Sequence, residues 1–398
     1  MDILNTYSVR LIDEAPTDFL RYLYHEINWK NRLIAITGSR GTGKTTMLKQ
    51  YAKLNCNYKN GKALYVSLDN IWFSSHTLFD LADEFAKNGG EVLLLDEVHK
   101  YQNWSQEIKN IYDYMPSLQV VFTGSSLLKI EKGEADLSRR AATYHLQGMS
   151  FREYLSYEHG INIKPLSLDD ILANHISIAT DFAGQFRPLP LFKEYLRYGY
   201  YPYYKEDKQL FHERLLSTVN AVLDIDLPAV YAVETLTIKR IKRLLSIIAE
   251  IVPCVPNISD MAQKVETTRV SLMKYLIYLS EAHLVMLMEK KSSGFKQMEK
   301  PEKIYLGNSN YCYAFAGDKA DIGNVRETFF FNQVRAKYGV AFSSATDFLV
   351  DGKYDFEVGG KSKTFEQIKE LPNGIVAADD IEVGFGRKIP LYLFGLLY

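Results

Sequence analysis

A glycine-rich loop near the amino terminus constrains the fold of this chain more than any other feature. The loop has the pattern G-x-x-x-x-G-K-[ST] and consists of Gly38, Ser39, Arg40, Gly41, Thr42, Gly43, Lys44, Thr45 and Thr46. An apolar, β-branched run precedes it at residues 32–37, and helix-forming residues follow it at 46–54. In such a strand–loop–helix unit, backbone N–H groups and the amino end of the helix surround nucleotide phosphates. The chain is therefore expected to bind a nucleoside triphosphate.

The residue types in the loop fit ATP and Mg²⁺. Glycines let the backbone curl close to an anion. Lys44 is expected to reach the β- and γ-phosphates, and the Thr45 hydroxyl is expected to ligate Mg²⁺. The alternative is a glycine-rich turn that carries a lysine by chance, which the flanking strand and helix disfavour.

A strand that ends in two acids completes the predicted site. The apolar residues 92–95 lead directly into Asp96 and Glu97. Ligands of open α/β sheets bind at the carboxyl ends of the strands. Asp96 is therefore expected to hold Mg²⁺, directly or through water, and Glu97 to polarise the attacking water as a general base. The alternative is a buried strand that ends in two solvated acids, which the spacing from the glycine-rich loop disfavours.

Two more strands are predicted after this pair. One covers residues 118–123 and ends in a polar tip, where Ser125 or Ser126 is a candidate contact for the γ-phosphate. The other lies near residues 142–147.

Two arginines, Arg139 and Arg140, stand just before the last of these strands. An arginine in this place can stabilise charge on the transferring phosphoryl group, either in its own subunit or in a neighbouring one. The alternative is that both are surface residues at the end of a helix.

Several further segments have characteristic sequences. They are Tyr65-Val66-Ser67-Leu68-Asp69, Asp96-Glu97-Val98-His99-Lys100, Thr123-Gly124-Ser125-Ser126 and Gly148-Met149-Ser150-Phe151-Arg152-Glu153-Tyr154-Leu155. Together with the glycine-rich loop they resemble the prokaryotic AAA+ ATP-binding proteins that carry a C-terminal domain of unknown function, over nearly the whole chain. The family usually has a glycine before its arginine, whereas this chain has Arg139 there, so Arg140 is the aligned residue.

The resemblance implies an α/β fold with four parts. Residues 1–150 are expected to form a P-loop AAA+ core with a parallel sheet, and residues 151–235 a helical lid. Residues 236–310 have the helix pattern of a winged helix-turn-helix, and residues 311–398 are expected to form a small α/β domain. This last domain resembles the restriction-endonuclease fold.

DNA is a candidate partner of the winged helix. The basic residues that would contact phosphates are Arg269, Lys274, Lys290, Lys291 and Lys296. Neighbouring glutamates dilute this charge, and winged helices also serve as protein-contact modules. The choice between DNA and an unknown protein partner stays open at this point.

The terminal domain contains most of a nuclease signature. Glu327, Asp347 and Glu357 occupy plausible positions for a metal-dependent site. The lysine expected two residues after Glu357 is missing, and Lys361 lies beyond a glycine pair. We therefore expect a degenerate domain that binds rather than cuts, with recruitment of Lys361 as the alternative.

Composition excludes several classes of protein. The chain has 398 residues, 47% hydrophobic and 24% charged, with a formal net charge of −1. These values are typical of a folded, multidomain protein and give no overall charge for binding nucleic acid. No signal peptide and no membrane-spanning run is recognised, so a cytoplasmic protein with no membrane partner is expected.

Three functions are compatible with these patterns, one of which is a transcription regulator or partner-binding scaffold in which the winged helix binds and ATP only sets the conformation. The leading function is an ATP-dependent switch, in which a core that hydrolyses Mg·ATP acts on a C-terminal binding half. Such a protein is also a candidate for assembly into a homo-oligomer. The alternative is an ATP-gated protein that binds or cleaves DNA. A helicase is excluded because the chain lacks a second RecA-like domain and an arginine-rich Gln-x-x-Gly-Arg motif.

Overall fold

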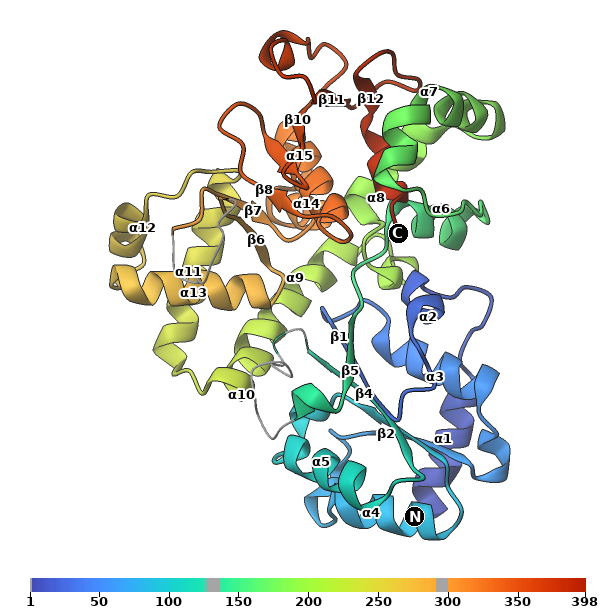
Figure 1. Cartoon of the computed structure of the whole chain (residues 1–398). Coiled ribbons are helices and arrows are strands. Elements are labelled where there is room, and N and C mark those ends of the chain that lie inside the picture. The colour runs from blue at the N-terminus through green and yellow to red at the C-terminus, as the bar shows by residue number, and fades with distance from the viewer. Residues whose placement is uncertain (1, 126, 128–136, 291–299) are drawn as a thin grey trace. The chain divides into compact units, whose positions relative to one another are not determined.

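The computed structural model describes residues 2–125, 127, 137–290 and 300–398. These residues form two compact units (Figure 1). The first unit contains residues 1–147 and the separate segment 225–232, and the second contains residues 148–224 and 233–398. The chain therefore leaves the first unit, returns to it for one short segment, and leaves it again.

The first unit is built on a parallel five-stranded sheet with the order β2-β3-β4-β1-β5. Its strands are β1 (Leu33–Gly38), β2 (Ala63–Ser67), β3 (Val92–Asp96), β4 (Gln119–Ser125) and β5 (Ala142–His145). Its helices are α1 (Asp2–Asp13), α2 (Tyr22–Glu26), α3 (Lys44–Asn55), α4 (Leu78–Lys87), α5 (Trp104–Tyr114) and α10 (Leu227–Tyr231). The predicted P-loop α/β core is confirmed.

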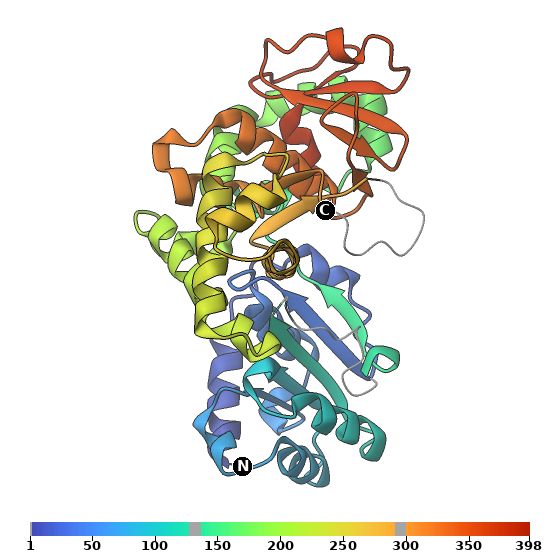
Figure 2. The ribbon, with the colours of Figure 1, turned by 90° about the vertical axis from the view of Figure 1, so that its left-hand side faces the viewer.

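Helices cover both faces of this sheet because its central strands are apolar on both sides (Figures 1 and 2). On one face, Leu81 and Ile108 of α4 and α5 pack against strand residues such as Leu93. On the other face, Ile12 of α1 and Met47 of α3 pack among a second set of strand side chains. This three-layer arrangement places the carboxyl ends of β1, β3 and β4 at one edge of the sheet.

The second unit combines helices with a small mixed sheet and a hairpin. Its helices are α6 (Phe151–His159), α7 (Leu168–Gln185), α8 (Pro188–Tyr198), α9 (Phe211–Ala221), α11 (Thr235–Ile251), α12 (Ile258–Lys264), α13 (Arg269–Glu281), α14 (Ser309–Ala316) and α15 (Ile322–Val334). Its strands are β6 (Val285–Met288), β7 (Lys303–Leu306), β8 (Val340–Ala341), β9 (Phe348–Val350), β10 (Tyr354–Gly359), β11 (Gly374–Ala378) and β12 (Lys388–Pro390). Strands β6 and β7 pair antiparallel, and the other five form a sheet with the order β12-β11-β10-β9-β8.

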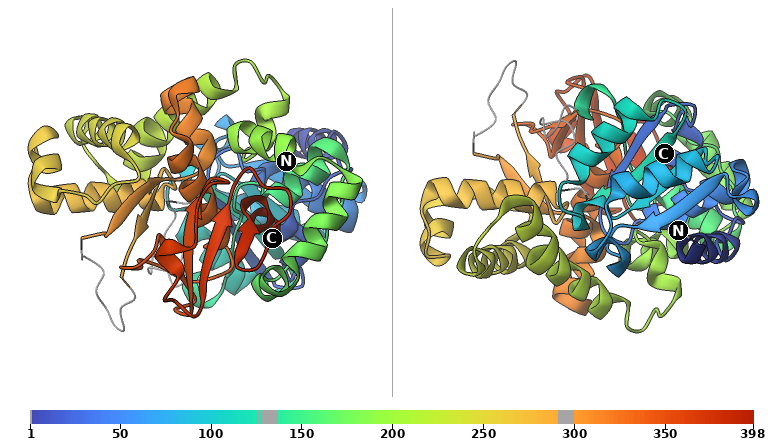
Figure 3. Two further views of the ribbon diagram at one scale, coloured as in Figure 1. Left: turned by 90° about the horizontal axis from the view of Figure 1, so that it is seen from above. Right: turned by 90° about the horizontal axis from the view of Figure 1, so that it is seen from below.

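Helices α11, α12 and α13 gather beside the hairpin β6–β7 (Figures 1 and 3). These are the elements that the sequence suggested for a winged helix-turn-helix. That assignment, and the boundaries at 235 and 310, remain predictions. The wing tip, with Lys291 and Lys296, lies outside the described residues.

The helices predicted as a lid share a core with the carboxyl terminus of the chain. Phe151 of α6 and Phe192 of α8 pack against Tyr392, and the carbonyl oxygen of Tyr398 accepts a hydrogen bond of 2.7 Å from the Ser150 hydroxyl. Ser150 also forms a capping box with Glu153 at the start of α6. Aromatic burial therefore joins the lid region and the terminal domain into one compact unit.

Candidate functional site

The glycine-rich loop joins β1 to α3 as the pattern predicts. Gly41 and Gly43 have φ angles of 84° and 97°, which side chains rarely tolerate. Gly43 is the residue before the first turn of α3. The loop therefore depends on glycine at these two positions, and it presents the amino end of α3 to a ligand.

Lys44 is buried at the start of α3. Its ammonium group donates hydrogen bonds to the carbonyl oxygens of Gly38, at 2.8 Å, and Ser39, at 2.9 Å. Burial lowers the pKa of Lys44, and the nearby carboxylates of Glu97, Asp96 and Asp226 oppose this shift. A positive group held by two loop carbonyls is well placed to bind phosphate.

Asp96 lies at the end of β3 and is surrounded by hydroxyl groups. One carboxylate oxygen accepts hydrogen bonds from Thr45 Oγ1, at 2.7 Å, and from the Tyr65 hydroxyl, at 2.8 Å. The other oxygen accepts a hydrogen bond from the Thr123 hydroxyl. The structure thus brings together Thr45 and Asp96, the two residues predicted to hold Mg²⁺. A carboxylate and a threonine hydroxyl are hard oxygen donors that suit this ion.

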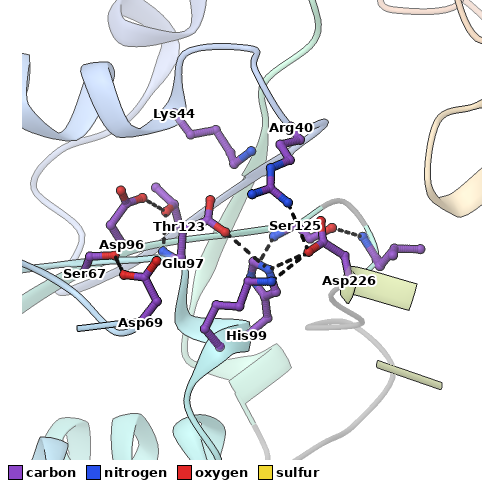
Figure 4. Close-up of polar contacts among 12 residues, drawn as sticks. Arg40, Lys44, Ser67, Asp69, Asp96, Glu97, His99, Thr123, Ser125 and Asp226 are labelled. Atoms are coloured by element: carbon purple, nitrogen blue, oxygen red, sulfur yellow. Dashed lines mark hydrogen bonds and ion pairs between the residues drawn. The ribbon is translucent and has the colours of Figure 1, made fainter. Parts of the chain in front are cut away.

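Glu97 points to a different part of the site than Asp96 (Figure 4). Its backbone is left-handed, with φ 54°, and its N–H donates to Thr123 Oγ1 at 3.1 Å. The turn places a side-chain oxygen of Glu97 3.3 Å from Nε2 of His99. The two acids of the predicted pair therefore face different partners, as separate metal-binding and base roles require.

Ser125, at the tip of β4, is tied to the same histidine. Its backbone N–H donates to Nδ1 of His99 at 3.4 Å, and its hydroxyl accepts from the N–H of Leu127 at 3.3 Å. A contact of the Ser125 side chain with phosphate remains a prediction. The other candidate, Ser126, lies outside the described residues.

The structure does not bring Arg139 and Arg140 to the glycine-rich loop. Both precede β5, which runs parallel to β1, so they lie near the amino ends of the strands and the loop lies at the carboxyl ends. The Arg140 guanidinium pairs with Asp113 at the end of α5, at 3.1 Å, and Arg139 is exposed. A role within the same subunit is therefore not supported, and a role in a neighbouring subunit remains a prediction.

Several residues of the site could not be found from sequence patterns. Tyr65 and Thr123 lie on the neighbouring strands β2 and β4, and only the sheet order brings their hydroxyls to Asp96. Arg21 is buried and donates to the carbonyl of Gln147, at 2.8 Å, and to the carbonyl of Thr42 in the loop. Tyr65 and Thr123 stand in segments with characteristic sequences, but no local pattern indicates the contacts of these residues, because their partners are distant in the sequence.

Asp226 is the most distant of these residues. It comes from segment 225–232, and its carboxylate lies 2.9 Å from the ammonium group of Lys100 and 3.6 Å from the guanidinium of Arg40 (Figure 4). Burial raises the pKa of Asp226, but His99 and Lys100 outweigh burial and bring it below the usual value. The residue is therefore a buried anion beside the glycine-rich loop.

A second charged cluster lies in the second unit. Glu327 on α15 accepts a hydrogen bond of 2.9 Å from Tyr305, and Asp347, just before β9, accepts one of 3.0 Å from the N–H of Val358. The ammonium group of Lys303 lies 3.7 Å from Glu327 and 3.4 Å from Asp347. The predicted acids are thus close to one another, and a lysine of β7 stands beside two of them.

The third acid, Glu357, is buried in β10 and pairs with Lys363. The turn that follows β10 closes with a hydrogen bond of 3.0 Å from the N–H of Lys363 to the carbonyl of Gly360, and this turn brings Lys363 back towards the strand. The lysine beside Glu357 is therefore Lys363, which argues against the alternative that Lys361 is recruited. Across the described ranges, no group of three acidic, histidine or cysteine side chains has the spacing to hold a metal ion.

The basic residues predicted to contact DNA are partly described. Arg269 and Lys274 lie on α13 and are exposed to solvent. Lys290 pairs with Glu302 at 3.1 Å. Two exposed cations and one paired cation give α13 and the hairpin a modest positive charge.

None of the helices in the part of the chain that the structure describes is long and apolar enough to cross a membrane.

Comparisons with known proteins agree with this description of the first unit. Residues 30–155 match the family described as an AAA domain, and residues 189–321 match a domain of unknown function, DUF8612. An uncharacterized protein of Methanocaldococcus jannaschii is 28% identical over 291 residues, which cover 70% of this chain. The chain covers 61% of the length of that relative.

Two solved structures illustrate how far the likeness extends. RuvB of Thermotoga maritima is 12% identical, with a TM-score of 0.31, over 72% of this chain and 89% of its own. AMPPCP-bound DnaA of Aquifex aeolicus is 18% identical, with a TM-score of 0.25, over 70% of this chain and 88% of its own. Scores of this size do not establish a shared overall architecture.

The family match at residues 30–155 contains the glycine-rich loop, the Asp96–Glu97 pair and all five strands of the parallel sheet. Residues 30–155 therefore form a P-loop domain of the AAA type, and residues 189–321 of the second unit match a domain of unknown function.

Proposed function

We propose that this protein is an ATP-dependent switch, in which Mg²⁺-dependent hydrolysis in the first unit controls a binding activity of the second. The observation that carries the proposal is the contact of 2.7 Å between Thr45 and Asp96, beside Lys44 and Glu97. A cytoplasmic location and assembly into a homo-oligomer belong to the same proposal. The partner bound by the second unit is a protein or DNA.

Each residue has a separate part in this proposal. Lys44 exchanges its two loop carbonyls for phosphate oxygens, which bind an ammonium group more strongly. Thr45 and Asp96 would hold Mg²⁺, which would neutralise charge on the phosphates. Glu97, which lies apart from Asp96, orients a water molecule and takes its proton.

Substitution of Lys44 tests the binding site. We expect Lys44→Ala to abolish ATP binding in equilibrium titration, since it removes the cation nearest the phosphates. Lys62→Ala is the matched control, because Lys62 is a half-exposed lysine of the same unit that pairs with Glu91. If Lys44→Ala binds ATP as tightly as the wild type, the site is assigned wrongly.

A second candidate function is ATP-gated cleavage of DNA. The observation in its favour is the approach of Glu327, Asp347 and Glu357, with Lys363 beside the last. The observation against it is that the ammonium group of Lys303 lies beside the first two carboxylates, where a metal ion would have to bind. We therefore expect binding without cleavage.

Plasmid nicking with Mg²⁺ or Mn²⁺ distinguishes these functions. The switch proposal expects no metal-dependent nicking by the wild type. Nicking that disappears in Asp347→Ala, and persists in the exposed control Glu366→Ala, would establish the nuclease instead.

A further inference from the structure

Segment 225–232 places one buried carboxylate among the residues of the nucleotide site. The side chain of Asp226 is only 4% exposed. Its Oδ1 atom lies 2.9 Å from the Lys100 ammonium, 3.6 Å from the Arg40 guanidinium and 3.7 Å from Nε2 of His99. A buried anion is costly unless cations neutralise it, so these contacts hold the segment in place.

His99 connects this carboxylate to Glu97. The N–H of Ser125 faces Nδ1 of the ring at 3.4 Å, which assigns the ring proton to Nε2. Nε2 lies 3.3 Å from Glu97 and 3.7 Å from Asp226, without the alignment of a hydrogen bond to either. The Nε2 atom thus lies between the carboxylates of the proposed general base and Asp226.

Arg40 connects the same carboxylate to the glycine-rich loop. Arg40 is part of the loop, its side chain is 44% exposed, and it has Asp226 as an anionic partner. The charges of both Arg40 and Asp226 act on the pKa of Lys44. A phosphate bound by Lys44 therefore attracts Arg40 and repels Asp226.

The γ-phosphate is expected to decide between attraction of Arg40 and repulsion of Asp226. In the proposed mechanism Glu97 orients the water that attacks the γ-phosphate, and His99 lies near both Glu97 and Asp226. ADP lacks the γ-phosphate and adds less negative charge on this side of the site. The electrostatic repulsion of the Asp226 carboxylate is therefore stronger with bound ATP than with bound ADP.

The backbone on both sides of segment 225–232 can transmit a movement of Asp226 to the second unit. A π-helical turn, Val222–Asp226, joins α9 to α10, and the boundary between the two units falls inside this turn, between residues 224 and 225. At the other end of α10, Ala232 has a left-handed φ of 49°. Both ends of the segment continue directly into the second unit, so its displacement is transmitted through the backbone.

We propose that Asp226 is a positioning residue that senses the γ-phosphate. It holds Arg40 and His99 in the arrangement of Figure 4, and it releases Arg40 to the phosphate when ATP binds. The inference rests on the proposed ATPase function and adds the element by which the nucleotide state reaches the second unit.

The test compares Asp226→Asn with Asp224→Asn. Asp224 is two residues earlier, is 49% exposed and pairs with Lys242, so it is a matched control that lies outside the site. Affinities for ADP and for the β,γ-imido analogue of ATP are measured for the wild type and both variants. We expect Asp226→Asn to increase the preference for the triphosphate about fivefold, because one repelling charge is removed, and Asp224→Asn to leave it unchanged.

If Asp226 had a purely structural role, Asp226→Asn would weaken the binding of both nucleotides equally. An unchanged preference for the triphosphate over ADP therefore overturns the inference. Hydrogen exchange of residues 225–232 in the wild type provides the second measurement, and it does not depend on the folding of a variant. We expect the triphosphate analogue, and not ADP, to change exchange in this segment. Equal exchange with both bound nucleotides overturns the inference alone, whereas failure of the wild type to bind either nucleotide overturns the proposed function as well.

Discussion

At the scale of single residues, the hydroxyl of Thr123 is the centre of the nucleotide site. It donates to the Asp96 carboxylate and accepts the N–H of Glu97, so it orients both acids at once. Thr123 is completely buried. A buried polar group that loses its partner costs more free energy than the bond itself contributes.

Thr123→Val keeps the shape of the side chain and removes the hydroxyl. We expect the variant to lose about 1–3 kcal/mol of stability, because two buried groups lose their partner, and to lose most of its ATP turnover. Denaturant titration and a steady-state assay measure the two effects. Thr143→Val, an exposed threonine on the edge strand β5, is the control. Wild-type stability in Thr123→Val would contradict the role given to this hydroxyl.

Glu327 gives the second unit a pH dependence. Burial, and then the charge of Asp347, raise its pKa to about 7. A carboxyl whose pKa is raised by folding binds its proton more tightly in the folded state than in the unfolded one. Stability is therefore expected to fall as pH rises from about 4.5 to about 7, and to change little from this source above that range.

Glu327→Gln should remove this dependence. The amide oxygen can still accept the Tyr305 hydroxyl, and no charge forms at high pH. We expect the difference in unfolding free energy between variant and wild type to shift by about 2 kcal/mol between pH 5 and pH 8, in favour of the variant at pH 8. The exposed Glu366→Gln is the control. Parallel pH profiles for wild type and Glu327→Gln would show that Glu327 titrates normally.

At the scale of elements, strand β5 and helix α5 decide where Arg140 acts. Because β5 is parallel to β1, a residue before its first position lies at the sheet edge opposite to the glycine-rich loop. The ion pair with Asp113 fixes Arg140 there and lowers the pKa of that carboxyl.

We accordingly expect Arg140→Ala to leave the affinity for ATP unchanged in a dilute solution of the protein. An arginine that served a neighbouring subunit would affect turnover only at concentrations where subunits associate. Nucleotide titration and turnover are measured over a range of protein concentrations. A loss of ATP affinity at the lowest concentration would place Arg140 in its own site and contradict the structure.

Helix α13 is the element on which a proposed binding of DNA would depend. If the second unit binds DNA, Arg269 and Lys274 supply its exposed positive charge. The double substitution Arg269→Glu and Lys274→Glu is then expected to abolish retention in a low-salt gel shift. Lys353→Glu with Lys369→Glu changes the charge equally at exposed sites beyond α13 and is the control. Equal retention by both double variants would exclude this surface.

At the scale of the whole molecule, the features that could be predicted from the sequence are those that depend on neighbouring residues. The glycine-rich loop and the strand that ends in Asp96 and Glu97 each carry their chemistry in consecutive residues. Their fold and their class were therefore predictable from the chain alone.

Contacts between distant residues were not predictable in the same way. Tyr65 reaches Asp96 through the sheet order, and Asp226 reaches Arg40 because a segment of the second half returns to the first unit. Lys363, and not the alternative Lys361, lies beside Glu357 because a turn after β10 folds the chain back. In each case the partner is chosen by tertiary packing, which leaves no periodic signal in the sequence.

Hydrolysis of ATP by Glu97→Gln is the measurement that we would make first, with and without duplex DNA. The matched control is Glu91→Gln, since Glu91 is 64% exposed and precedes the same strand, β3, at its opposite end. We predict that Glu97→Gln binds ATP but turns it over at least about a hundredfold more slowly than the wild type, whereas Glu91→Gln behaves as the wild type. Turnover by Glu97→Gln at the wild-type rate would show that Glu97 is not the base and that the proposed switch is not driven by this site.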